Sequence, residues 1–192
     1  MNPPLRIMFD IETLSTRPTA CVLSIGAVIF GGSSAAPADY PREFYVNVSD
    51  PEGTIDADTV LWWLSQDKAA QDRLQKDRMP LGDALFQFLL WVSVHCNGPG
   101  GELQQGRLGR KDVEFWSRSP SFDEVILTEA GRRAGTGVPF NYRASRDCRT
   151  IEALAGFKAD STSKQGVLHD ALADAKMQAD TVQQCLDKLR IL

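Results

Sequence analysis

The sequence has no long apolar run, and no basic segment followed by an apolar one stands near its start. Its longest apolar stretches, such as residues 84–94, are too short and too interrupted to cross a bilayer, which takes a helix of about 20 apolar residues. We therefore expect no membrane span and no signal peptide.

Cysteine is scarce and shows no metal-binding or redox spacing. None of the four cysteines belongs to a C-x-x-C pair: Cys21, Cys96, Cys148 and Cys185. Without an export signal, reduced thiols are the expected state. A zinc site at His95 and Cys96 is disfavoured, because adjacent residues chelate poorly and the sequence offers no second Cys/His pair.

An excess of basic residues is also missing, since the formal net charge is −4. This argues against a protein that grips long nucleic acid by charge alone. It leaves room for a protein that binds a few nucleotides, because bound divalent cations reverse the sign of an acidic site. With 192 residues, 43% hydrophobic and 24% charged, the chain suits one ordinary globular domain spanning residues 1–192.

Hydrophobic patterning along the chain predicts an α/β fold. Apolar or alternating segments indicate four strands, the first three forming an antiparallel meander: 7–9, 21–30, 44–48 and 113–116. Helical spacing and capping residues predict five helices: 56–65, 81–94, 121–132, 150–155 and 168–192. This order suits a mixed sheet covered by helices. The segment 97–112, with five glycines and no periodicity, is expected to be a flexible surface loop.

Asp10 and Glu12 follow the first apolar segment at the spacing of a strand. Residues i and i+2 of a strand point to one face, so the two carboxylates would lie side by side. Such a pair at the end of a buried strand is unfavourable unless a cation neutralises it, and hard divalent ions prefer oxygen ligands. A strand end that frays into solvent would explain a single D-x-E motif equally well.

Two further acidic positions are ambiguous when each is considered alone. Asp123 stands in the first turn of a predicted helix, where an acid ordinarily complements the helix dipole. Asp174 stands one turn into the last helix, and His169 precedes Asp170, a residue suited to cap that helix. On one helix His169 and Asp174 would lie about 140° apart, so they share a site only if His169 stands off the helix.

Together these motifs resemble the DEDDh subgroup of the DnaQ-like exonucleases, from Asp10 to Asp174. Longer stretches are similar to the branch holding the phage exonuclease A enzymes, the exonuclease VIII-like proteins and the mycobacterial Rv2179c-like exoribonucleases: FDIETLSTRPTACVLSIGAVIF, LWWLSQ, FWSRSPSFDEVIL and RDCRT. The resemblance implies a ribonuclease-H-like fold with a five-stranded mixed sheet flanked by helices. It also implies a cytoplasmic protein of a bacterial cell or a phage-infected host.

The resemblance implies a role for each candidate residue. Asp10, Glu12, Asp123 and Asp174 would hold two Mg²⁺ or Mn²⁺ ions, with Asp10 bridging them, Glu12 and Asp174 on the nucleophile side and Asp123 on the other ion. His169 would act as the general base toward the attacking water. The reaction would release nucleoside 5′-monophosphates from the 3′ end of a strand.

The resemblance also points to residues that would contact substrate. Thr13 and Leu14 occupy the positions that seat the terminal nucleotide in the family. Trp62 or Trp63 is expected to stack on a base, although one of two adjacent helical residues normally packs in the core. Arg118 stands where the branch has a Gly/Asn-rich turn, and it would meet a phosphate.

Several alternatives stay open at this point. Single-stranded DNA is the favoured substrate and RNA the alternative, because no sequence feature reveals a contact to the 2′-OH. An inactive nuclease-like module that binds protein or nucleic acid is a further alternative. A homodimer that completes the cleft is expected from small size alone. Asp147 is interpreted as a helix cap and His95 as a structural residue.

Overall fold

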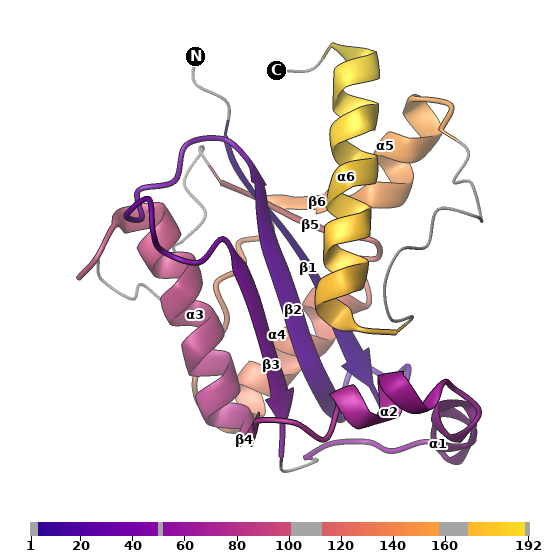
Figure 1. Ribbon diagram of the computed structural model, residues 1–192. Coiled ribbons are helices and arrows are strands. Elements are labelled where there is room, and N and C mark those ends of the chain that lie inside the picture. Colours follow the sequence, from indigo (N-terminus) through magenta and orange to yellow (C-terminus); the bar gives the residue numbers. More distant parts are fainter. Residues whose placement is uncertain (1–3, 50–51, 101–112, 158–168, 191–192) are drawn as a thin grey trace.

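The computed structural model describes residues 4–49, 52–100, 113–157 and 169–190, and it shows a mixed sheet with helices on both faces (Figure 1). The six strands lie in the order β4-β3-β2-β1-β5-β6. Their bounds are β1 (Leu5–Thr13), β2 (Val22–Gly31), β3 (Glu43–Val48), β4 (Arg78–Met79), β5 (Val113–Ser117) and β6 (Ser145–Asp147).

The pairing of the strands agrees with the predicted meander. β1, β2 and β3 pair antiparallel, whereas β5 pairs parallel to β1 and β6 parallel to β5. The sheet has six strands, whereas the resemblance implies five and hydrophobic patterning indicates four. β4 and β6, with two and three residues, are too short to leave a hydrophobic pattern.

The helices are α1 (Ala57–Leu64), α2 (Lys68–Arg73), α3 (Leu81–Asn97), α4 (Asp123–Ala134), α5 (Cys148–Leu154) and α6 (Ala171–Leu189). α2 has no counterpart among the predicted helices, because its six residues bury only Ala70. α3 runs to Asn97, so the predicted loop over 97–112 begins inside a helix, and its residues 101–112 lie outside the described part. In the described part, no helix combines the length and apolar character that a membrane span requires.

The first turns of α1 and α4 lack the side-chain caps that the sequence pattern indicates. Asp56 precedes α1 but does not cap it, because its carboxylate accepts a hydrogen bond from Ser15 Oγ at 2.6 Å. α4 begins at Asp123, after a turn in which the backbone N–H groups of Phe122 and Asp123 donate to the carbonyl of Ser119 at 2.7 and 2.9 Å. The α4 start is thus set by backbone hydrogen bonds and not by a capping serine.

Strand alternation divides the residues of β1 between two hydrophobic cores. Phe9 and Ile11 pack with residues of α3 and α4, whereas Met8 packs with residues of α5 and α6. Because neighbours in a strand point to opposite faces, Asp10 and Glu12 share the face of Met8 and lie under α6. β1 also extends beyond both acids, so they stand inside a strand and not at a fraying end, and Glu12 is only 9% exposed.

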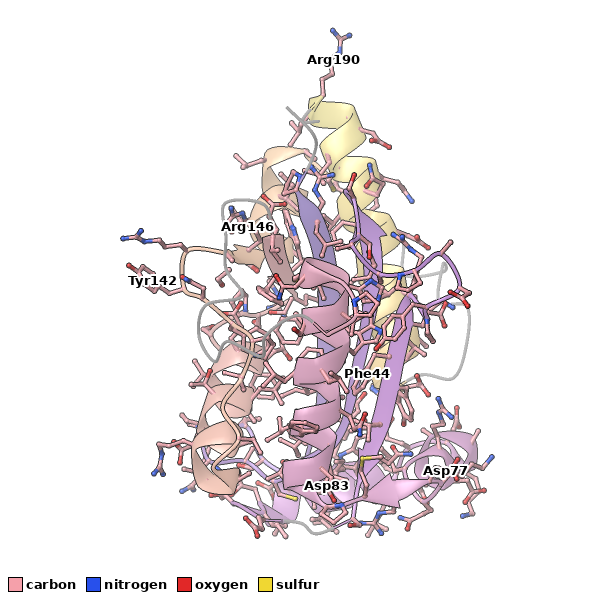
Figure 2. The ribbon with its side chains drawn as sticks, turned by 90° about the vertical axis from the view of Figure 1, so that its left-hand side faces the viewer. Phe44, Asp77, Asp83, Tyr142, Arg146 and Arg190 are labelled. Carbon is pink, nitrogen blue, oxygen red and sulfur yellow. The ribbon has the colours of Figure 1, made fainter. Side chains whose placement is uncertain are left out.

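The opposite face of the sheet is covered by α3 and α4. In Figure 2 the labelled Phe44 lies beside α3, where its ring centroid is 5.4 Å from that of Phe88 and 5.8 Å from that of Trp91. His95, near the end of α3, is buried and donates from Nε2 to the carbonyl of Pro41 at 3.0 Å. The interpretation of His95 as a structural residue is confirmed.

Gly26 sets the distance between α6 and the sheet. It pairs with Asp10 in the β1–β2 ladder, so it faces α6. A Cβ atom at this position would lie 2.2 Å from backbone atoms of Ala171 and Leu172, in the first turn of α6. Only a residue without a side chain permits this approach, which brings the acid of α6 over those of β1.

We expect Gly26→Ala to lower the free energy of unfolding by about 1–3 kcal/mol or more, because backbone must move to admit the methyl group. Urea denaturation followed by circular dichroism measures this change. Gly82→Ala, in α3, is the matched control, because a Cβ atom there would have no neighbour closer than 3.9 Å. The control should be unchanged or more stable. An unfolding free energy equal to that of the wild type for Gly26→Ala would contradict the contact.

Candidate active site

The structure brings the four predicted acids together beneath the first turns of α6. Asp10 and Glu12 come from β1, Asp174 from α6, and Asp123 from the start of α4, which follows β5. Because β1 and β5 are parallel neighbours, the residues that follow β5 meet the end of β1 at one edge of the sheet. Burial, followed by the charges of Asp123, Glu12 and Asp174, raises the pKa of Asp10 well above its ordinary value.

Burial keeps the acids of the cluster from ionising fully at neutral pH. Burial, followed by the charges of Asp174, Asp170 and Asp123, raises the pKa of Glu12 to about 8. Burial also raises the pKa of Asp123 to about 7, although hydrogen bonds and the charge of Arg149 act in the opposite direction. Like charges in a poorly hydrated site repel each other unless a cation neutralises them.

Glu12, His169 and Asp174 together offer a set of metal ligands. One potential ligand atom from each lies within 4.8 Å of the others, and among the described residues no other group of three does so. The pair His95–Cys96 belongs to no such group in the described part. Two carboxylates and an imidazole form a donor set that suits a divalent cation.

Gln178 joins the site, although it belongs to none of the sequence motifs. Its side chain is 4% exposed, and its Nε2 donates to Oδ1 of Asp10 at 2.8 Å. Its Oε1 is buried and has no hydrogen-bond partner within the described structure. Such an acceptor beside buried acids fits a site that takes a hydrated cation, whose water would donate to it. The signal was the spacing of four from Asp174, which places both side chains on one face of α6.

His169 stands off the last helix, as the sequence predicts. Its φ of 62° lies in the left-handed region. Oδ1 of Asp170 then caps α6 by accepting from the N–H groups of Leu172 and Ala173 at 3.0 and 2.9 Å. The imidazole ring lies edge-on to Trp62, with 4.6 Å between the ring centroids. This arrangement places the imidazole beside the acids and not on the far side of the helix.

The two adjacent tryptophans have different environments. Trp63 is buried and donates from Nε1 to the carbonyl of Thr13 at 2.9 Å. Trp62 is 42% exposed beside His169. Leu14, directly after Thr13, is half-buried against the cluster that contains Trp63. Trp63 therefore supports the strand end, whereas Trp62 is partly exposed beside His169.

Arg118, which follows β5, forms an ion pair with Glu152. Its guanidinium donates to both carboxylate oxygens of Glu152, at 3.0 and 3.1 Å. Arg149 donates from Nη1 to the carbonyl of Arg118 at 2.5 Å, and its charge reaches Asp123. Asp147 caps α5 by accepting from the N–H of Arg149 at 3.2 Å, which confirms that interpretation. The sequence gives no sign that Arg149 lies near Asp123, because the pairing of β6 with β5 brings the start of α5 there.

Comparison with known proteins gives one family and a consistent fold. Residues 5–186 match the family described as the 3′-5′ exoribonuclease Rv2179c-like domain. No curated protein matches the chain.

Three solved structures illustrate the fold that the chain shares. E. coli exonuclease I in complex with a dT13 oligonucleotide has a TM-score of 0.59 at 11% identity, covering 97% of this chain and 41% of that one. The nuclease domain of 3′hExo, a DEDDh family member bound to rAMP, has a TM-score of 0.57 at 12% identity, covering 96% and 93%. The Mg²⁺- and Mn²⁺-bound form of S. pombe Pop2p has a TM-score of 0.55 at 10% identity, covering 95% and 82%.

We expect Glu12→Gln to stabilise the metal-free protein at pH 8 and not at pH 4.5. A carboxyl whose pKa rises from 4.5 to about 8 on folding contributes stability at low pH that is lost as the pH rises through that window. In EDTA at pH 8, the free energy of unfolding should rise by at least about 1.4 kcal/mol, the equivalent of one pKa unit. Urea denaturation at both pH values measures the difference, and a gain of equal size at pH 4.5 would exclude relief of ionisation as its cause.

Proposed function

The chain belongs to the 3′-5′ exoribonuclease Rv2179c-like domain family, and on this premise we propose that it shortens single-stranded RNA from its 3′ end. It is a 3′-5′ exonuclease of the DEDDh type, and therefore a hydrolase. The observation that carries the proposal is the convergence of Glu12, His169 and Asp174 within 4.8 Å, beside the acids of β1 and α4.

The reaction we propose depends on two Mg²⁺ or Mn²⁺ ions held by Asp10, Glu12, Asp123 and Asp174. Bound divalent ions would polarise the phosphate and acidify the attacking water. Support comes from the hard oxygen donors, from the raised pKa values of the acids and from the unpartnered Oε1 of Gln178. The Pop2p structure of similar fold is described as a Mg²⁺- and Mn²⁺-bound form.

The chain's own side chains would then perform two tasks. Gln178 orients the carboxylate of Asp10 through its 2.8 Å hydrogen bond, so that Asp10 presents a defined edge to the site. His169 accepts the proton of the attacking water, since an imidazole can accept a proton at neutral pH. The ring contact with Trp62 keeps the imidazole toward the acids.

We propose that the strand enters along α1 and the end of β1. Trp62 would stack on a base with its exposed face, while Thr13 and Leu14, which follow Glu12 at the strand end, would seat the terminal nucleotide. Arg118 would meet a phosphate while it shares its charge with Glu152, as a two-sided guanidinium can.

The proposed preference for RNA follows from the family description. The family description supports RNA, whereas the resemblances in the sequence favour single-stranded DNA. The related folds do not separate the two, since one neighbour is described with a dT13 oligonucleotide and another with rAMP. DNA is therefore retained as the second candidate, and a homodimer stays a prediction from size alone.

The first test is a time course on RNA and DNA of one sequence, labelled at either end, with Mn²⁺ or with EDTA. We expect nucleoside 5′-monophosphates from the 3′ end, only with metal, and faster from RNA. Faster shortening of DNA would reverse the sugar preference and leave the reaction intact. No shortening of either strand would contradict the proposed function.

In the same assay His169→Ala should lower kcat by about 100- to 10,000-fold, the usual contribution of a general base. Calorimetric Mn²⁺ binding should be largely retained, because the carboxylates stay in place. Asp10→Ala should abolish both activity and tight Mn²⁺ binding, because the site would lose one of the four carboxylates proposed to hold the ions. Activity retained in Asp10→Ala would refute the proposed metal site.

Trp62→Ala should raise KM by roughly 5- to 150-fold, the equivalent of about 1–3 kcal/mol for one base stacked on an aromatic ring. Leu64→Ala is the matched control, because Leu64 lies in the same helix and is 67% exposed. Equal KM values for the two variants would show that Trp62 does not contact the strand.

A further inference from the structure

Arg73, the last residue of α2, reaches the residue at which the last helix begins. Its Nε lies 2.7 Å from Oδ2 of Asp170. The other carboxylate oxygen of Asp170 caps α6, so the carboxylate is held by the helix on one side and by the arginine on the other. Figure 1 shows α1 and α2 beside the lower end of α6, where this contact is made.

Arg73 is held against β3 of the sheet by contacts with Tyr45 and Asn47. Its Cζ lies 3.8 Å from the ring centroid of Tyr45 in β3. Its backbone carbonyl accepts from Nδ2 of Asn47 at 2.9 Å, and Oδ1 of Asn47 accepts from the Tyr45 hydroxyl at 2.7 Å. A guanidinium that is both stacked and hydrogen-bonded holds its position far better than a free side chain.

This fastening bears directly on His169, which immediately precedes Asp170. A non-glycine residue at a φ of 62° is kept there only when its surroundings hold it. Asp170 constrains the backbone on its C-terminal side. The rings of Trp62 and Trp63 constrain the imidazole, with centroids 4.6 and 6.2 Å away. The tryptophans and Arg73 belong to neighbouring helices, α1 and α2, so one segment of the chain supplies both constraints.

We propose that Arg73 is a positioning residue that holds His169 over the acid cluster through Asp170. The proposal rests on the proposed function of His169 as the base. It assigns to α2 the task of keeping the imidazole aligned with the acids. It differs from a role in substrate binding, because the contacts of the guanidinium with Asp170 and Tyr45 lead to His169 and predict a change in kcat and not in KM.

Nuclear magnetic resonance can test this positioning directly, because the chain contains two histidines, His95 and His169. In metal-free Arg73→Met, we expect the ring resonances of His169 to shift or broaden, because the ring moves in the field of Trp62. His95 lies in α3, in contact with Trp91 and Pro41, and serves as the internal control. Arg73→Lys should restore the signal only in part, because lysine keeps the charge but not the planar stack.

Kinetics give a second measurement. Arg73→Met should lower kcat by about 10- to 100-fold, the usual effect of removing a residue that orients another. KM and Mn²⁺ affinity should stay close to the wild-type values. Arg132→Ala is the control, because this arginine pairs with Glu129 on the exposed side of α4. In an Asp170→Asn background, which keeps the capping oxygen and loses the charge, Arg73→Met should cause little further loss.

Three outcomes would overturn the proposal. Unchanged His169 resonances with unchanged kcat would show that Arg73 does not position His169. Equal shifts of His95 and His169 would indicate general loosening of the fold. A higher KM at constant kcat would assign Arg73 to the substrate. If the wild type shows no exonuclease activity, the proposed function fails, and the spectra still decide whether Arg73 positions His169.

Discussion

The close approach of α6 to β2 at Gly26 is the contact on which the rest of the site depends. The acids of β1 point toward α6, and a side chain at Gly26 would collide with the first turn of that helix. Because this one position has no side chain, Asp174 and Gln178 lie directly over Asp10. The geometry of the site is therefore a consequence of backbone packing between a strand and a helix.

That packing concentrates like charges where water is scarce. Burial raises the pKa values of Asp10, Glu12 and Asp123, and repulsion between neighbouring acids raises those of Asp10 and Glu12 further. Ionising these groups therefore works against folding when no cation is bound. The protein surrounds the cluster with neutral or compensated groups: the amide of Gln178 touches Asp10, and the pair of Arg73 with Asp170 lies at its edge. The cluster thus lowers stability when no cation is bound, and its carboxylates are donors that suit a divalent ion.

Local rules predict the elements of this fold well where the pattern is long. The three-stranded meander and the helices over α3 and α6 follow from hydrophobic spacing, and the caps at Asp147 and Asp170 are confirmed. The short elements α2 and β4 leave no pattern, because a segment of six residues or fewer buries too little apolar surface. Local rules also fail at Asp56. Its carboxylate accepts a hydrogen bond from Ser15, which is distant in the sequence, and it does not cap α1.

The sequence by itself determined which acids and which histidine belong together, because their order and spacing match one family's motif and strand periodicity places Asp10 and Glu12 on one face. Tertiary structure decided which groups surround them. Gln178, Arg149 and Arg73 reach the site or its edge through packing between elements far apart in the chain, and Trp62 is exposed only because Trp63 takes the core position. Contacts of this kind depend on distances between backbones, which no local pattern of residues encodes.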